Sequence, residues 1–77
     1  MTYEEVNRKA AEFNRCLRLK KRMLALDPAV IGYQRAVARK QQVGTCTRRM
    51  NGIRRAFEDA GYAVYYDAAG KIVRVEI

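Results

Sequence analysis

Two arginine pairs flank an asparagine and a glycine in the stretch TRRMNGIRRAF, residues 47–57. Arginine can donate paired hydrogen bonds to guanine, and asparagine can pair with adenine, in the major groove of DNA. Residues three and four apart share one face of a helix, and such a face would hold Thr47, Arg48, Asn51, Arg54 and Arg55. Gly52 costs a helix about 1 kcal/mol relative to alanine, which the close approach of a phosphate would explain. The stretch therefore predicts a helix that contacts nucleic acid. The alternative is a solvated charged face with a packing glycine.

The positive charge of the chain is concentrated in its central part. Sixteen Lys and Arg stand against eight Asp and Glu over 77 residues, for a net charge of +8. Between Arg8 and Arg55 there are fourteen basic residues and two acidic ones, Glu12 and Asp27. Like charges gathered in this way repel one another, and a polyanion such as a phosphate backbone relieves the repulsion. The distribution favours nucleic acid as a partner over simple solubility, because surfaces charged for solubility mix both signs.

The residues that most catalysis and metal binding require are missing from the sequence. The chain has no His, no Ser and no glycine-rich phosphate loop, so nucleophile, base and stabiliser do not come together. Cys16 and Cys46 are too few for a zinc site, and both fall in apolar stripes where reduced core thiols are expected. We therefore expect a protein that is not an enzyme and that needs no metal and no cofactor.

A long first helix is predicted over residues 2–26. Thr2, followed by Glu5 three residues later, has the pattern of a capping box. Apolar residues then recur every three or four positions, as on a buried helix face: Tyr3, Val6, Ala10, Phe13, Leu17 and Leu24. The opposite side holds Arg8, Arg15, Arg18 and Arg22. Arg18 and Arg22 are expected to contact phosphates, and the alternative is a solvated side of a helix that pairs with a second copy of the chain.

Two shorter helices are predicted next. Asp27 can cap the first of them with Pro28 in its first turn, and this helix should run to about Val43. Its outer side holds Arg35 and Arg39. Gly44 can take the left-handed conformation that ends a helix, and Thr45 can cap the next one. The apolar stripe of that third helix is Cys46, Met50, Ile53, Phe57 and Ala60, with Gly61 as its stop.

Residues 62–77 are typical of a β-hairpin. Asp67 opens a turn whose left-handed position is Gly70, so that Asp67 pairs with Lys71. The face expected to lie on the core carries Ala63, Tyr65, Val73, Val75 and Ile77. The other face is too apolar to stand in water uncovered, and it carries Tyr62, Val64, Tyr66, Ile72, Arg74 and Glu76. The predicted fold is a single α+β domain over residues 1–77, with three helices followed by a C-terminal hairpin.

A short helix, a turn with glycine, a basic helix and a hairpin, in this order, resemble the second half of a winged helix-turn-helix domain. The resemblance covers about Val30 to Ile77, with VGT as the turn, CTRRMNGIRRAFEDAG as the recognition-like helix and DAAGK as the tip of the wing. On that resemblance Arg48, Asn51 and Arg55 would enter a groove of DNA, and Lys71 would touch a phosphate.

The sequence thus predicts a small non-enzymatic nucleic-acid-binding protein, with DNA favoured over RNA. Its third helix would make the main contacts, and phosphate contacts would come from Arg18, Arg22, Arg35, Arg39 and Lys71. Six neutralised phosphates would give a slope of about −5 in a plot of log affinity against log salt. One alternative is a protein-binding inhibitor or adaptor, of the kind that mobile elements carry, which uses its basic surface or hairpin face on an acidic partner. An RNA- or ribosome-associated protein is another alternative.

Size and hydropathy add three expectations. No apolar run approaches the roughly 20 residues of a membrane span, and the polar N-terminus does not resemble a signal peptide. A cytoplasmic protein is therefore expected. Because so small a domain buries little surface, homodimerisation through the first helix or the hairpin would add stability.

Overall fold

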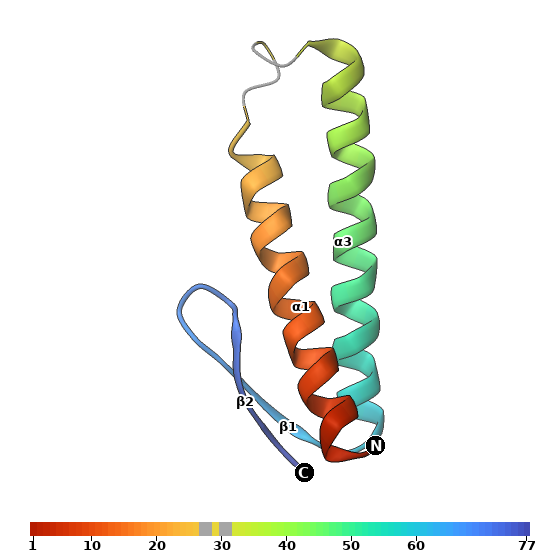
Figure 1. Cartoon of the computed structure of the whole chain (residues 1–77), viewed down its shortest axis with the longest axis vertical. Coiled ribbons are helices and arrows are strands. Elements are labelled where there is room, and N and C mark those ends of the chain that lie inside the picture. The colour runs from red at the N-terminus through yellow and green to blue at the C-terminus, as the bar shows by residue number, and fades with distance from the viewer. Residues whose placement is uncertain (27–28, 30–31) are drawn as a thin grey trace.

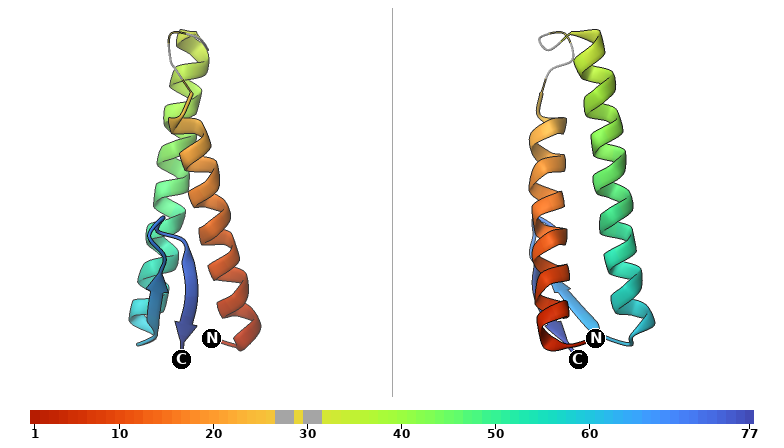
Figure 2. Two further views of the ribbon diagram at one scale, coloured as in Figure 1. Left: turned by 90° about the vertical axis from the view of Figure 1, so that its left-hand side faces the viewer. Right: turned by 45° about the vertical axis from the view of Figure 1, so that its right-hand side comes forward.

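Two long antiparallel helices lie side by side, and a β-hairpin packs along one half of the pair (Figures 1 and 2). The computed structural model describes residues 1–26, 29 and 32–77. Its elements are α1 (Tyr3–Leu24), α3 (Tyr33–Asp59), β1 (Ala63–Tyr66) and β2 (Ile72–Glu76). The chain forms a rod of 45 × 21 × 17 Å, with both termini at the same end (Figure 1).

The first helix forms as its sequence predicts. The side chain of Thr2 accepts a hydrogen bond of 3.2 Å from the backbone N–H of Glu5, which satisfies one of the free donors of the first turn. The carboxylates of Glu4 and Glu5 lie in that same turn, where the helix dipole favours them. The helix ends at Leu24, two residues before the predicted limit.

The prediction of two separate helices after residue 27 is wrong, because one helix runs without a break from Tyr33 to Asp59. The described part of the chain therefore has two long helices and a hairpin, and the helix-turn-helix layout predicted around Gly44 does not form. Positive φ angles occur at Gly32, Gly61 and Gly70 and not at Gly44. The caps predicted at Asp27 and Pro28 lie outside the described residues.

The apolar seam explains why Gly44 does not end the helix. Val43, Cys46, Met50, Ile53 and Phe57 follow one another at steps of three or four, so the buried face continues in phase across the glycine. Thr45 does not act as a cap, since its hydroxyl donates to the carbonyl of Gln41 four residues earlier at 3.1 Å. A glycine inside a helix costs about 1 kcal/mol, which packing of the whole seam against α1 outweighs.

Gly61 ends α3 as predicted. It has a φ of 75°, its N–H donates to the carbonyl of Glu58 at 3.0 Å, and the N–H of Tyr62 donates to the carbonyl of Phe57 at 3.0 Å. This pair of bonds is a Schellman motif. The predicted turn of the hairpin also forms: Asp67 Oδ1 accepts from the N–H groups of Ala69 and Lys71, both at 2.9 Å, and Gly70 has a φ of 86°.

The predicted core face of the hairpin is confirmed at Val75 and wrong at its other positions. Tyr66 pairs with Ile72 as expected, but a β-bulge at Val73 then shifts the register by one residue, so that Tyr65 pairs with Arg74 and Val64 with Val75. The face that packs on the helices therefore combines Tyr62, Val64, Ile72 and Val75. Tyr65, Val73 and Ile77, which were expected in the core, are 47%, 59% and 68% exposed.

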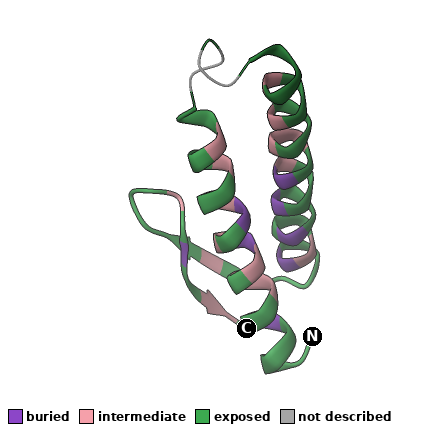
Figure 3. Cartoon of the chain, turned by 45° about the horizontal axis from the view of Figure 1, so that its top comes forward, coloured by how far each residue is buried: buried purple, intermediate pink, exposed green. Residues whose placement is uncertain are grey.

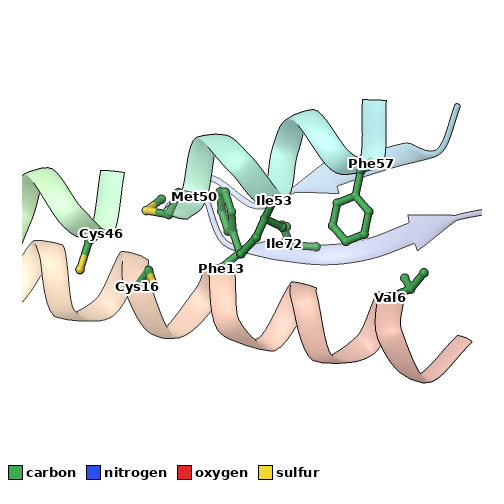
Figure 4. Packing of buried hydrophobic residues seen from close by; sticks show 8 residues of the cluster. All are labelled: Val6, Phe13, Cys16, Cys46, Met50, Ile53, Phe57 and Ile72. Carbon is green, nitrogen blue, oxygen red and sulfur yellow. The ribbon is translucent and has the colours of Figure 1, made fainter. Parts of the chain in front are cut away.

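The core lies in the half of the helix pair that the hairpin covers. β2 packs on α1 and β1 on α3, and the buried side chains gather between these elements (Figures 3 and 4). They are Val6, Phe13, Cys16, Cys46, Met50, Ile53, Phe57 and Ile72. Asn14 ties the hairpin to α1, because its amide donates to the carbonyl of Ile72 at 2.9 Å and its oxygen accepts from the N–H of Ile72 at 2.7 Å.

Candidate nucleic-acid interface

Most of the predicted binding residues of α3 lie on a face directed away from the rest of the fold. Two helix positions correspond to a rotation of about 200°. Arg48 follows buried Cys46 by two positions, and Arg55 follows buried Ile53 by two. Both arginines are therefore exposed on the side opposite to α1. We define the α3 stripe as the residues at helical spacing on this side and along its border with the hairpin, namely Lys40, Gly44, Thr47, Arg48, Asn51, Arg54 and Arg55.

The α3 stripe is cationic over about 22 Å, the length of fifteen helical residues between Lys40 and Arg55. Between Tyr33 and Phe57 the sequence contains no carboxylate, and the first acidic residue of the helix is Glu58. Among the described residues the ion pairs are Arg49 with Glu12, at 3.8 Å, and Arg74 with Glu76. Neither pair includes a member of the stripe, so its charge is not neutralised within the described part of the chain.

Contacts within the fold hold some members of the stripe in place. Arg48 Nη2 donates to the hydroxyl of Thr45 at 3.2 Å, and the hydroxyl of Thr47 donates to the carbonyl of Val43 at 2.9 Å. The guanidinium of Arg54 lies 5.9 Å from the centre of the Phe13 ring and 5.8 Å from that of Tyr66, within reach of a cation–π interaction. Arg54 thus marks the edge of the stripe beside the hairpin.

The remaining predicted binding residues lie elsewhere. Arg39 is half-buried, and its guanidinium donates to the carbonyl of Leu26, so it links α3 to the residues after α1. Arg35 is exposed in the first turn of α3. Lys71 is exposed at the hairpin tip, which rests on α1 through a 2.7 Å bond from Lys21 Nζ to the carbonyl of Ala69. The structure therefore brings together the five residues from 47 to 55 but not the other five.

Arg18 and Arg22 belong to a second basic surface on α1. Arg8, Arg15 and Arg18 each follow a buried residue of α1 by two positions, and Arg22 lies four positions after Arg18 on the same side. We call this set the α1 stripe: Arg8, Arg15, Arg18 and Arg22, all exposed. Glu12, which helical spacing could place beside these arginines, pairs with Arg49 of α3 instead.

Lys40 and Gly44 are members of the α3 stripe that the sequence reading missed. A turn was expected at Gly44, which assigned Lys40 and Arg48 to different helices. The signal was nevertheless present, because positions 40, 44, 48, 51 and 55 keep the three- and four-residue steps of one continuous helix face.

Aromatic side chains at the hairpin serve packing. The Tyr66 ring lies 5.9 Å from that of Phe13, and the Tyr62 ring lies 6.3 Å from that of Phe57, both tilted. Beside them is a shallow hollow lined by Arg54, Glu58, Tyr62, Val64 and Tyr66. Since these rings contact the two most buried phenylalanines, they anchor the hairpin on the helices.

Cys16 and Cys46 face each other between the helices (Figure 4). Both are free thiols, 3% and 8% exposed. Burial raises the pKa of the Cys16 thiol above its ordinary value, and the proximity of Cys46 and Glu12 raises it further. A thiol of this kind stays protonated at neutral pH and behaves as a core residue, since the thiolate is the reactive form.

Comparison with protein-family models, with curated protein sequences and with solved structures finds no match for this chain. Within the described residues, the helices lack the length and apolar character needed to cross a bilayer. The same part of the chain holds no group of three metal-ligating side chains. The most prominent features of the described surface are the two basic stripes.

Proposed function

We propose that this protein is a small, non-enzymatic nucleic-acid-binding protein that holds double-stranded DNA along the α3 stripe. The observation that carries the proposal is a run of cations without ion pairs along one continuous helix: Lys40, Arg48 and Arg55, with Arg54 at the border with the hairpin. Neutralising phosphates with such residues supplies most of the affinity in non-specific DNA binding, through the release of counterions.

Helix dimensions favour DNA over RNA as the ligand. An α-helix with its side chains is about 10–12 Å wide, and the major groove of B-form DNA is about 12 Å wide. The corresponding groove of an RNA duplex is deep and narrow and does not admit side chains. Arg48 and Arg55 lie opposite the seam that packs on α1, so the rest of the fold does not block their approach to a groove.

Asn51 and the two glycines of α3, Gly44 and Gly52, are features that a simple charged face would not need. Asn51 lies between Arg48 and Arg55, where it could pair with an adenine edge. A side-chain atom added at Gly52 would meet nothing within 4 Å, so the backbone is open to a phosphate there. The hollow beside Gly44 is lined by Val37, Lys40, Gln41, Gly44, Thr45 and Arg48.

In the experiment the protein is titrated into a fluorescent DNA duplex of about 12 base pairs, roughly twice the length of the stripe. Binding is measured as the fluorescence anisotropy of the duplex. Four cations predict a slope of about −3.6 for log affinity against log salt. To isolate the α3 stripe, R48Q/R55Q is compared in the R15Q/R22Q background, in which the α1 stripe is weakened. There it should change the slope to about −1.8 and weaken binding about 100-fold at 50 mM salt. A salt-independent affinity, or an unchanged affinity of this variant, would contradict the proposal.

A matched control is provided by R49Q/R74Q. It removes the same two positive charges, but Arg49 and Arg74 are the arginines held in ion pairs with Glu12 and Glu76. Its affinity should fall far less than that of R48Q/R55Q, because only the general field of the protein changes. Equal losses would mean that net charge and not the α3 stripe determines binding. A duplex RNA and a single strand, titrated in parallel, should bind more weakly than duplex DNA.

A second candidate function is the binding of an acidic partner protein. The observation in its favour is an apolar hollow in the half of the helix pair that the hairpin leaves uncovered, lined by Leu24, Tyr33, Ala36, Val37, Arg39, Lys40 and Val43. Leu24 and Tyr33 are 60% and 84% exposed, and exposed apolar patches usually mark protein contacts. This candidate predicts no duplex affinity at physiological salt, and spectral shifts at Leu24 and Val37 when an acidic amphipathic peptide is added.

A further inference from the structure

We infer that the protein bridges two DNA duplexes, one on the α3 stripe and a second on the α1 stripe. The inference rests on the proposed function and extends it from binding to bridging. Its basis is the presence of two separate cationic surfaces, the α1 stripe and the α3 stripe. Each surface presents four exposed basic side chains at helical spacing.

The two stripes face away from each other. α1 and α3 pack through Phe13 and Cys16 on one side and Cys46, Met50 and Ile53 on the other (Figure 4). Each arginine that follows a buried residue of its own helix by two positions is rotated from it by about 200°. On this ground the cations of α1 lie on the side of α1 away from α3, and Arg48 and Arg55 lie on the side of α3 away from α1. Arg54 lies at the border with the hairpin. Figure 2 shows the two helices side by side along the rod.

The α1 stripe matches the α3 stripe in length and charge. From Arg8 to Arg22 it extends over about 21 Å, the rise of fourteen helical residues. A shallow hollow at this stripe is lined by Arg8, Ala11, Glu12 and Arg15. Because Glu12 is engaged with Arg49, the four arginines form no ion pair within the described part of the chain.

One duplex cannot occupy both stripes. DNA has a persistence length of about 150 base pairs, and the short dimensions of the rod are only 21 and 17 Å, so a single duplex cannot bend around it. Two duplexes can bind together, because the thickness of the rod is more than twice the Debye length of about 8 Å at physiological salt. Phosphates on one side are then largely screened from those on the other.

The test is a sandwich experiment on a sensor surface in 50 mM salt. A biotinylated duplex is immobilised, the protein is loaded and its bound amount is recorded, and a second, fluorescent duplex is then passed over the surface. The natural protein should capture the second duplex. The variant R15Q/R22Q should load on the first duplex and bind the second about 200-fold more weakly, because two of four phosphate contacts are lost.

The outcomes separate this inference from the proposed function. If the protein does not load on the first duplex, the proposed function fails. If it loads normally but captures no second duplex, the bridging inference alone fails. Capture by R15Q/R22Q at the natural level would also overturn the inference, since it would mean that paired protein molecules bridge through two α3 stripes. R35Q/R74Q carries the same charge, leaves Glu12 paired with Arg49, and should bridge. A thermal melt of each variant confirms that it is folded.

Discussion

Replacing Gly44 by alanine should stabilise the protein, because Gly44 lies in the interior of α3. Alanine is favoured over glycine by about 1 kcal/mol at such a position. The added methyl group would meet only Nη1 of Arg48, at 3.6 Å, which is an ordinary contact. Gly52→Ala should add a similar amount, because nothing lies within 4 Å of its new side chain. The two positions are eight residues apart, about 12 Å along the helix, so their effects should add to about 2 kcal/mol.

The assay for this prediction is thermal unfolding followed by circular dichroism. In a domain of this size 1 kcal/mol moves the Tm by about 4–8 °C, so the double variant should melt about 10 °C above the natural protein. Gly70→Ala is the matched control, since Gly70 has a φ of 86° and alanine there should cost about 1–2 kcal/mol. A lower Tm for Gly44→Ala would contradict the continuous helix, because it is the result expected if Gly44 ended a helix in the left-handed conformation.

Two further predictions concern the contacts that hold the fold together. Asn14→Ala should destabilise the protein by about 2 kcal/mol in urea unfolding, because both hydrogen bonds to Ile72 are lost. As a control, Asn7→Ala at an exposed position should change stability by less than about 0.5 kcal/mol. Equal effects of the two substitutions would contradict the anchoring role of Asn14. Because the pKa of the Cys16 thiol is raised, the folded state holds the thiol proton more strongly than the unfolded state does. The contribution of this thiol to stability is therefore complete below its ordinary pKa and is lost as the pH rises through the pKa of the folded state. The natural protein should therefore lose more stability than Cys16→Ala between pH 8 and pH 10, and parallel losses would refute that linkage.

Local signals in the sequence predict much of this fold. The cap at Thr2, the stop at Gly61 and the turn from Asp67 to Lys71 each depend on a few adjacent residues, and each forms as expected. The order of helical region and hairpin follows from the same signals. These features are predictable because the hydrogen bonds that define them are made within the segment itself.

The errors arise where local and long-range terms compete. Gly44 and Thr45 have the local pattern of a helix boundary, but the seam from Val43 to Phe57 packs in phase along α1 and outweighs it. The bulge at Val73 depends on how the hairpin fits the helices, and it exchanges the inner and outer faces of β2 after Ile72. Both outcomes are determined by tertiary packing, which spacing along the chain does not encode directly.

The basic residues were identified by their types, but their grouping depended on the helix boundaries. With α3 continuous, Lys40 joins Arg48 and Arg55 on one side, and Arg39 turns toward α1 and the carbonyl of Leu26. Arg18 and Arg22 lie on the far side of α1. The orientation of each arginine relative to the buried seam therefore decides which surface it belongs to.

The claim that DNA binds to α3 can be tested by observing the arginine side chains while DNA is added. In two-dimensional NMR spectra of the ¹⁵N-labelled protein, kept in excess over a short DNA duplex, the Nε–Hε signals of Arg48 and Arg55 should shift first and furthest. The arginines of the α1 stripe should shift as well if that stripe binds a second duplex, whereas the signals of Arg49 and Arg74, which are held in ion pairs, should change little. Shifts confined to α1 or the hairpin, or no shifts at any arginine, would contradict the claim that α3 carries the nucleic-acid interface.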